Sequence, residues 1–252
     1  METVKDTHIP SGNAQDGFER EPQRILECIA LHAERGDRID DETLQAMRAA
    51  APGLANVPAD EVFSALDRIL ISDIAGQTIL DCLDILAIVL PELKPMADCP
   101  QNTPYHIYDV LGHTAGVIDA SPAVSVSRWA ALFHDVGKPR CRRVDAGGRD
   151  HFKGHARVGA DIARSALERL GASQGFAEDV YRLVCLHEWF PMETDDGVRY
   201  AIEELGGRVE LYRALLALQV ADSHAKAPIA AERSDIARRF QGRLERLERD
   251  LP

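Results

Sequence analysis

The sequence contains few cysteines, and none of them is paired in a pattern that holds a metal or a disulfide framework. Five cysteines are scattered over 252 residues, their number is odd, and no CxxC occurs. Thiolate zinc sites and disulfide-stapled folds depend on such paired spacings. The cysteine pattern therefore argues against both classes.

The sequence also lacks an apolar run long enough to span a bilayer. The longest run, 79–90, contains Asp81 and Asp84, whereas a membrane helix needs about 20 apolar residues. The first 21 residues are polar and have no apolar centre of the kind found in signal peptides. We therefore expect a cytoplasmic protein without a membrane partner, whose cysteines stay reduced.

Positive charge is scarce. The chain has 29 Lys and Arg against 41 Asp and Glu, a net charge of −12. This balance argues against a protein that coats nucleic acid non-specifically. The exception is a basic loop that follows residue 138 and contains Arg140, Arg142, Arg143 and Arg149. Hydrophobic residues make up 45% of the chain, which is ordinary for a globular protein with a substantial core.

Apolar residues recur with helical spacing along most of the chain, and no convincing strand-like alternation is present. Ile79, Leu83, Leu86 and Leu90, for example, are separated by four, three and four positions. Glycines at 137, 171 and 206–207 are interpreted as helix ends. The fold class is therefore predicted to be all-α. Helices are expected at about 79–90, 103–117, 125–136, 154–170, 176–188, 208–225 and 232–248.

Ionisable residues continue the apolar stripes of five of these helices. They are His113, the pair His134 and Asp135, His155, His187 and Asp222. One such residue alone is more often a hydrogen-bonded core residue or an exposed helix end. An unpaired buried charge costs several kcal/mol, however, so ionisable residues from five helices that meet in the core would need a shared partner. Imidazole together with carboxylate suits Zn, Mn, Fe, Ni or Co rather than Ca.

These residues resemble the H…HD…D signature of the HD-domain metal-dependent phosphohydrolases. The segment HDVGKP at 134–139 is similar to the HD[IV]GK motif of that superfamily. HFKGHARVGA at 151–160 and LHE at 186–188 resemble the two additional histidine segments of some subfamilies. The resemblance implies a helical bundle that holds a divalent metal.

A wider resemblance covers about residues 20–225. The segments 21–54, VLPEL at 89–93 and QNTPYHIYDVLGHT at 101–114 are similar to the neck, body and HD domain of bacterial tRNA nucleotidyltransferases, the CCA-adding enzymes. The family's nucleotidyltransferase head, with its GGS and paired-Asp motif, has no counterpart in the sequence. The family's base-reading EDxxR stands here as Arg20, Glu21, Pro22, Gln23 and Arg24, in which only the final arginine is retained. We therefore expect no addition of nucleotides to tRNA.

The resemblance also suggests how the chain is divided. The predicted boundary lies near residue 98, because a proline-containing interval follows it. The expected segments are a mobile leader at 1–20, a small neck-like and body-like helical lobe at 21–98, an HD domain at 99–225 and a C-terminal helix at 226–252.

The resemblance implies a role for each candidate residue. His113, His134, Asp135 and Asp222 would be primary ligands of a divalent transition metal, and His155 and His187 would bind a second ion or contact the substrate phosphate. Asp135 and Lys138 are the predicted catalytic residues. Lys138, Arg142 and Arg143 are predicted to contact the phosphate, and His106 and His151 to flank the site.

The implied function is hydrolysis of a phosphomonoester or phosphodiester by a metal-activated water. The implied substrate is a nucleotide, a cyclic nucleotide or an RNA-end phosphate. The alternative is a non-catalytic module that binds tRNA or a separate nucleotidyltransferase and keeps a vestigial HD site. An eroded site would be expected to have lost a ligand, and the acidic charge gives little support to tRNA binding. The enzyme is therefore favoured.

Overall fold

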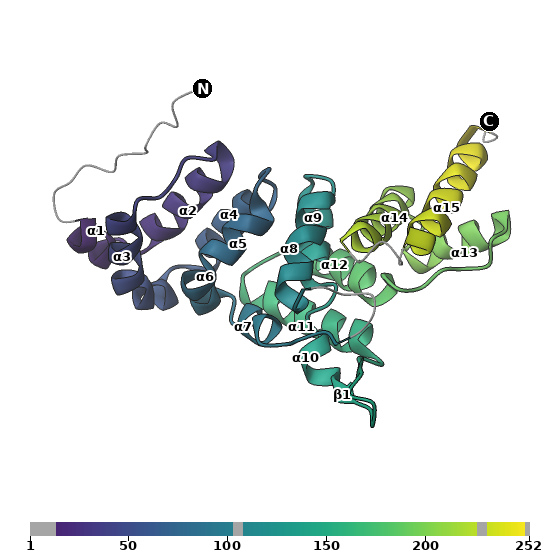
Figure 1. Ribbon diagram of the computed structural model, residues 1–252. Coiled ribbons are helices and arrows are strands. Elements are labelled where there is room, and N and C mark those ends of the chain that lie inside the picture. Colours follow the sequence, from purple (N-terminus) through teal and green to yellow (C-terminus); the bar gives the residue numbers. More distant parts are fainter. Residues whose placement is uncertain (1–13, 103–107, 226–230, 250–252) are drawn as a thin grey trace, which may run out of the picture.

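The computed structural model describes residues 14–102, 108–225 and 231–249 (Figure 1). Within these ranges the chain is helical apart from one small hairpin, which confirms the predicted all-α class. Thr103, Pro104 and His106, on which the predicted start of a helix and one flanking histidine fall, lie outside the described residues. No described helix has the length and apolar character needed to cross a membrane.

Residues 14–98 form an N-terminal lobe of short helices. The last seven residues of the expected leader form helix α1 and bury Phe18. The elements of the lobe are α1 (Ala14–Arg20), α2 (Gln23–Arg35), α3 (Asp41–Ala50), the 3₁₀ helix η1 (Ala51–Asn56), α4 (Ala59–Leu70), α5 (Ala75–Asp81), α6 (Leu83–Val89) and α7 (Leu93–Ala97).

The single helix expected at 79–90 is broken at Cys82 into α5 and α6. The apolar spacing continues through the break, so the sequence pattern does not reveal it. The two pieces pack on different neighbours: α5 packs against α8 (Val110–Ala120), whereas α6 packs against η1 and α7. Tertiary packing therefore overrides the local periodicity at this point.

Residues 108–249 form a C-terminal domain around α8. Its other elements are α9 (Ser125–Phe133), α10 (Lys138–Cys141), β1 (Arg143–Val144), β2 (Asp150–His151), α11 (His155–Arg169), α12 (Gln174–Leu186), α13 (Asp195–Glu204), α14 (Val209–His224) and α15 (Ala231–Arg249). The antiparallel β1–β2 hairpin and α13 were not expected from the sequence. In Figure 1, α15 lies along α14 and the hairpin projects from the opposite end of the domain.

Two predicted helix boundaries also change. Helix α8 begins at Val110, because the Asp109 side chain accepts a hydrogen bond from the Gly112 amide (2.6 Å) and caps the helix. Helix α9 ends at Phe133, so the following residues form a turn rather than the last turn of a helix.

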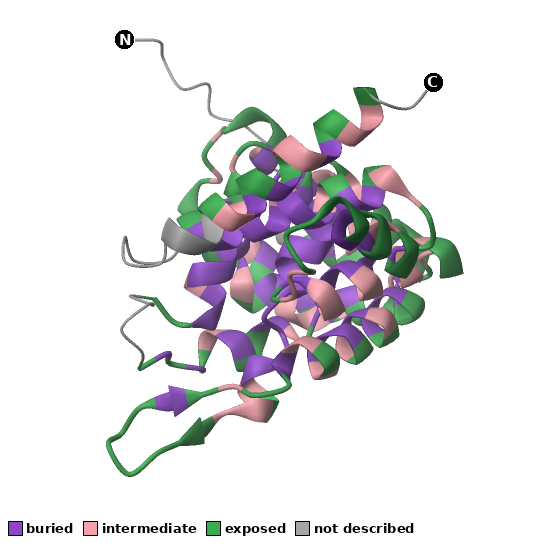
Figure 2. Ribbon diagram, turned by 90° about the vertical axis from the view of Figure 1, so that its right-hand side faces the viewer, coloured by how far each residue is buried: buried purple, intermediate pink, exposed green. Residues whose placement is uncertain are grey.

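The lobe and the domain share one continuous core. Figure 2 shows the buried residues inside the molecule and the exposed residues around them. At their contact, the Asp67 carboxylate on α4 accepts hydrogen bonds from the Trp129 indole (2.9 Å) and the Ser125 hydroxyl on α9. Phe63 stacks on Trp129 with ring centroids 5.3 Å apart. This mixed polar and aromatic contact fixes α9, and with it the turn that follows α9, against the lobe.

Candidate metal centre

Four buried histidines point the same ring nitrogen toward one another. The Nδ1 atoms of His134, His155 and His187 lie 2.7, 2.8 and 2.7 Å from backbone carbonyl oxygens three residues earlier, and Nδ1 of His113 lies 3.4 Å from the carbonyl of Ala225. A carbonyl only accepts, so these contacts place the ring proton on Nδ1 and leave Nε2 as an electron-pair donor. Protein metal sites orient their histidine ligands in this way.

One half of the cluster combines two histidines with two carboxylates. His113 Nε2 lies 3.0 Å from Asp222 Oδ1 and 3.4 Å from His134 Nε2. Asp135 Oδ2 lies 3.2 Å from His134 Nε2 and 3.7 Å from His113 Nε2. We call these four residues the first half-site. They are the four residues predicted as primary ligands, and the structure brings them together.

The other half is built on the second oxygen of Asp135. Oδ1 lies 3.2 Å from His155 Nε2 and 3.8 Å from His187 Nε2, and the two histidine nitrogens are 3.3 Å apart. We call Asp135, His155 and His187 the second half-site. Asp135 thus faces both half-sites, one with each carboxylate oxygen.

The fold buries all these side chains. Asp135 and His134 are 1% and 0% exposed. Burial opposes ionisation of Asp135, but the surrounding His134, Lys138 and His155 outweigh it and hold its pKa well below the usual range. Burial, together with His134 and His155, lowers the pKa of His187 to about 4. At neutral pH, Asp135 is therefore ionised and His187 is neutral, the states in which each can bind a metal.

A glycine allows the second half-site to form. A Cβ atom at Gly137 would lie 2.2 Å from the carbonyl oxygen of His155 and 2.6 Å from the Gly159 amide, both on α11. Gly137 has a φ of −78°, so its backbone is not in the left-handed conformation common at helix ends. Its role is to let the turn after α9 approach the start of α11, and this approach brings His155 to Asp135.

Lys138 is buried beside the first half-site. Its ammonium lies 2.6 Å from Asp135 Oδ2 and donates to Gln101 Oε1 at 2.7 Å. It also lies 5.4 Å from the centre of the Phe152 ring. Only 5% of the residue is exposed, so it is not a solvated surface lysine.

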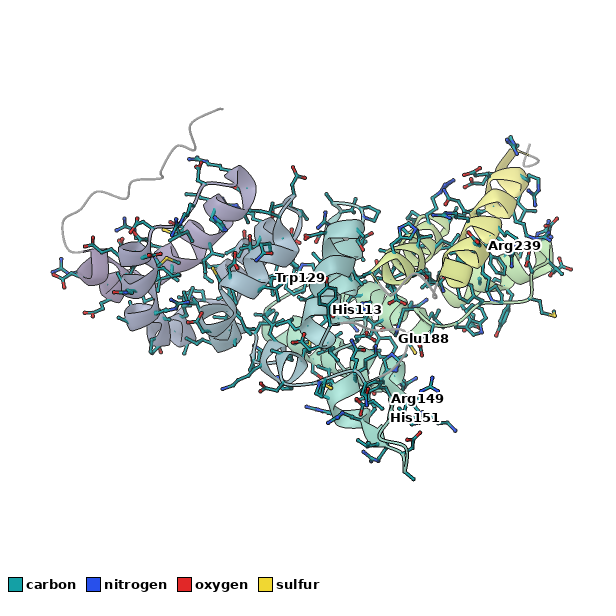
Figure 3. All side chains as sticks on the ribbon, in the orientation of Figure 1. His113, Trp129, Arg149, His151, Glu188 and Arg239 are labelled. Atoms are coloured by element: carbon teal, nitrogen blue, oxygen red, sulfur yellow. The ribbon has the colours of Figure 1, made fainter. Side chains whose placement is uncertain are left out.

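A cavity of about 280 Å³ opens onto the second half-site and Lys138. Its lining adds side chains from the hairpin, from the turn between β2 and α11, and from the turn after α12, and Figure 3 labels two of them, His151 and Glu188. The full lining is Asp135, Lys138, Asp150, His151, Phe152, Lys153, His155, His187 and Glu188. The predicted flanking position of His151 agrees with this lining.

The two arginines predicted to contact phosphate are not part of this lining. Arg142 Nε donates to the buried Asp150 carboxylate at 2.8 Å, and the other oxygen of Asp150 accepts from the Asn102 amide at 2.8 Å. Arg143 is exposed on β1. In the structure, Arg142 therefore braces the hairpin, and Arg143 stands outside the cavity.

Four residues near the metal cluster escaped the sequence analysis. Gln101 and Phe152 lie in loops, where no periodicity marks a residue as buried or as part of a site. Lys153 and Glu188 each sit two residues or fewer from a candidate histidine. Closeness in sequence to a candidate histidine is the signal by which both could have been predicted as site residues.

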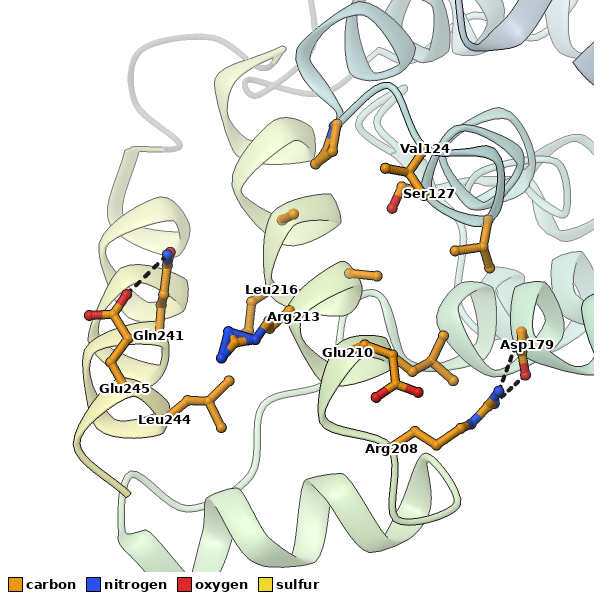
Figure 4. Close-up of a pocket in the computed structure, with 15 residues that line it drawn as sticks. Val124, Ser127, Asp179, Arg208, Glu210, Arg213, Leu216, Gln241, Leu244 and Glu245 are labelled. Carbon is orange, nitrogen blue, oxygen red and sulfur yellow. Dashed lines mark hydrogen bonds and ion pairs between the residues drawn. The ribbon is translucent and has the colours of Figure 1, made fainter. Parts of the chain in front are cut away.

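A larger cavity, of about 470 Å³, lies between α9, α12, α14 and α15 (Figure 4). Its floor is mainly apolar, and some of its charged rim groups pair with each other or with neighbours, as Arg208 does with Asp179 (2.7 Å). None of the residues predicted for the site lines it. Of the clustered ionisable groups, Asp135, Lys138, His155 and His187 line the smaller cavity.

Comparison with known proteins agrees with this geometry. Residues 105–227 match the family model of the HD domain. The chain is 32% identical over 229 residues to the CC-adding tRNA nucleotidyltransferase of Thermus thermophilus, a match that covers 87% of this chain and 49% of that protein. It is 30% identical over 233 residues to the A-adding tRNA nucleotidyltransferase of Deinococcus radiodurans, covering 87% and 53%.

A third relative is named for a different activity. The bifunctional uridylyltransferase/uridylyl-removing enzyme of Mycobacterium tuberculosis is 30% identical over 230 residues, covering 83% of this chain and 27% of that protein. The chain thus spans about half the length of the two tRNA nucleotidyltransferases and about a quarter of the uridylyl-removing enzyme. The family match and the histidine–aspartate cluster confirm the resemblance inferred from the sequence: the chain carries an HD domain.

Proposed function

We propose that this protein is a metal-dependent phosphohydrolase whose reaction takes place at Asp135. The observation that carries the proposal is that one buried carboxylate faces two histidine-rich half-sites, with Oδ2 toward His113 and His134 and Oδ1 toward His155 and His187. Shared carboxylates between two metal ions are common in enzymes that hydrolyse phosphate esters.

The donor set fits divalent transition metals. Four Nε2 atoms and the carboxylates of Asp135 and Asp222 are the nitrogen and oxygen ligands that Zn, Mn, Fe, Ni and Co accept. The first half-site would hold one ion, and the second half-site would hold another. Metal bound there supplies Lewis acidity, which lowers the pKa of a water and polarises a phosphoryl oxygen.

The chain itself supplies the positive charge that a phosphate requires. Residues 138–157 contain seven Lys and Arg against two Asp, in a protein with a net charge of −12. Lys138 and Lys153 both line the cavity. Lys138 would neutralise phosphate charge next to the reacting phosphorus, and Lys153 would attract the substrate from solvent.

The cavity favours a small substrate or the end of a chain. A volume of about 280 Å³ is near the lower end of ligand pockets in proteins. We propose a nucleotide, a cyclic nucleotide or an RNA-end phosphate, with Phe152 as an apolar surface beside the phosphate. A relative named for removing a uridylyl group supports this class, because such removal cleaves a nucleotidyl ester.

The alternative of a tRNA-binding module receives less support. Residues 14–98, the part that resembles the neck and body, contain 17 Asp and Glu against seven Lys and Arg. Such a surface repels a phosphate backbone. The complete and buried ligand set also argues against a vestigial site.

The test is hydrolysis by the purified chain of a panel containing 2′,3′-cyclic nucleotides, nucleoside monophosphates and an aryl phosphate. We expect activity on at least one ester class, its loss on treatment with a chelator, and its recovery with Mn, Ni, Co, Fe or Zn. Asp135→Asn is the matched inactive control. Absence of hydrolysis across the panel by metal-loaded protein would contradict the proposal.

A further inference from the structure

Gln101 is a buried residue in the loop between α7 and α8 that makes three hydrogen bonds in two directions. Its Oε1 accepts from the Lys138 ammonium at 2.7 Å. Its Nε2 donates to the backbone carbonyls of Asp109 at 3.2 Å and Tyr108 at 3.4 Å. Only 6% of the residue is exposed. A glutamine amide that is bonded at both ends cannot rotate without losing bonds on each side.

These bonds connect Lys138 to the beginning of α8. Asp109 is the residue that caps α8, and α8 carries His113 of the first half-site. Gln101 therefore holds the ammonium at a fixed position relative to the helix that bears a metal ligand. The connection runs through side-chain amide bonds and is separate from the contact between Lys138 and Asp135.

A lysine ammonium needs such support to act at a fixed point. Its four-carbon stem is flexible, and Lys138 starts the short helix α10 directly after a turn. Asp135 holds the ammonium on one side (2.6 Å) and Gln101 holds it on another. If Asp135 also binds a metal, its carboxylate is shared between the metal and Lys138, whereas the Gln101 oxygen contacts Lys138 without being a metal ligand.

We propose that Gln101 is a positioning residue that sets where the Lys138 ammonium meets the substrate phosphate, an inference that rests on the proposed phosphohydrolase function. Gln101 itself touches no reacting atom. Its effect on turnover passes through Lys138, so its removal costs little once Lys138 has been removed.

The first experiment measures the position of Lys138 without measuring activity. Reductive methylation followed by peptide mass spectrometry reports how fast each lysine is modified, and Lys153, exposed at the same site, is the internal reference. We expect Gln101→Met to raise the modification rate of Lys138 at least threefold relative to Lys153. An unchanged ratio would overturn the proposal.

Two further variants separate a specific bond from a general loosening. Asn102→Ala removes the neighbouring side-chain bond to Gly148 (2.6 Å), which does not involve Lys138, and should leave the Lys138 rate as in wild type. Gln101→Glu keeps an acceptor oxygen for the ammonium and should protect Lys138 more than Gln101→Met does. Equal exposure of Lys138 in all three variants would contradict a specific role for the Gln101 oxygen.

The second experiment is a kinetic double-mutant cycle with Lys138→Met on whichever ester the wild type hydrolyses. We expect Gln101→Met to lower kcat about 10-fold at unchanged metal content, and to change kcat less than twofold in the Lys138→Met background. Additive effects would overturn the proposal. Lack of any wild-type hydrolysis would refute the proposed function, whereas the methylation result would still decide whether Gln101 holds Lys138.

Discussion

The N-terminal lobe and the C-terminal domain bury different kinds of side chain. In residues 14–98 the buried polar residues are Thr43, Ser72 and Thr78, and none of them ionises near neutral pH. The C-terminal domain buries a larger set of ionisable residues: His113, Arg128, His134, Asp135, Lys138, Asp150, His155, His187 and Asp222. The two regions share one apolar core, yet only one of them places charge inside it.

This difference indicates that the lobe contributes to packing, whereas the domain holds the groups that carry the proposed chemistry. Buried charges destabilise a fold unless they are paired or bind a metal, so the domain carries a cost that the lobe does not. The lobe contributes instead by holding α9, through Asp67 and Phe63, at the position from which His134 and Asp135 follow. Substitutions in the two regions should therefore have effects of different kinds.

The largest expected effect follows from Asp135→Asn. Asparagine keeps the shape but removes the charge that both half-sites share, so metal affinity should fall by more than about 100-fold and hydrolysis should be lost. Elemental analysis after gel filtration and a hydrolysis assay measure the two quantities. Full metal content in a folded Asp135→Asn protein would show that the ligand assignment is wrong.

A core substitution in the lobe should lower stability and leave metal binding unchanged. Ile29 on α2 is fully buried, and truncating such a residue to alanine costs about 2–5 kcal/mol of unfolding free energy. Ile29→Ala should lower the urea midpoint while leaving metal content per folded molecule unchanged at 10 °C. Loss of metal in folded Ile29→Ala protein would mean that the lobe takes part in the site directly.

Lys138→Ala should separate metal binding from phosphate recognition. The ammonium cannot ligate a metal while protonated, so the variant should keep its metal but lose about 10- to 1000-fold in kcat/KM, or about 1.4 to 4 kcal/mol. Because phosphate charge is present in the ground state and shifts in the transition state, both KM and kcat should change. Wild-type kinetics would remove Lys138 from the catalytic residues.

The smallest effect distinguishes two adjacent arginines. Arg142→Ala leaves the buried Asp150 carboxylate without its ion-pair partner, and such a loss costs about 1–3 kcal/mol. Arg143→Ala removes an exposed side chain and should change stability by less than about 0.5 kcal/mol. Thermal unfolding of the two variants side by side checks this. Equal melting temperatures would contradict the brace assigned to Arg142.

The sequence predicted the metal cluster because each ligand continues an apolar helical stripe. Asp222 after Leu211, Leu215 and Leu218 is the clearest case, and all four residues are buried on α14. Helical periodicity predicts which face is buried, and buried faces of one domain converge. Ionisable residues on those faces therefore had to meet, which is what the structure shows.

The parts that the sequence did not predict depend on loops and on close backbone approach. Gln101 contacts Lys138 from 37 positions away, and no local pattern indicates that partner. Arg142 and Arg143 are identical in type, yet only Arg142 reaches Asp150. The start of α13, by contrast, had a local signal. Thr194 caps this helix by accepting a hydrogen bond from the Gly197 amide, and a threonine followed by two aspartates is typical of a helix start.

The most direct test of the account is the number of metal ions bound, measured by elemental analysis and calorimetric titration of wild type and His187→Ala. If Asp135 serves two half-sites, the wild type should bind two ions per chain. His187→Ala should then bind one, because the ligands of the first half-site remain in place. Binding of two ions by both proteins, or of no ion by the wild type, would contradict the shared-carboxylate centre.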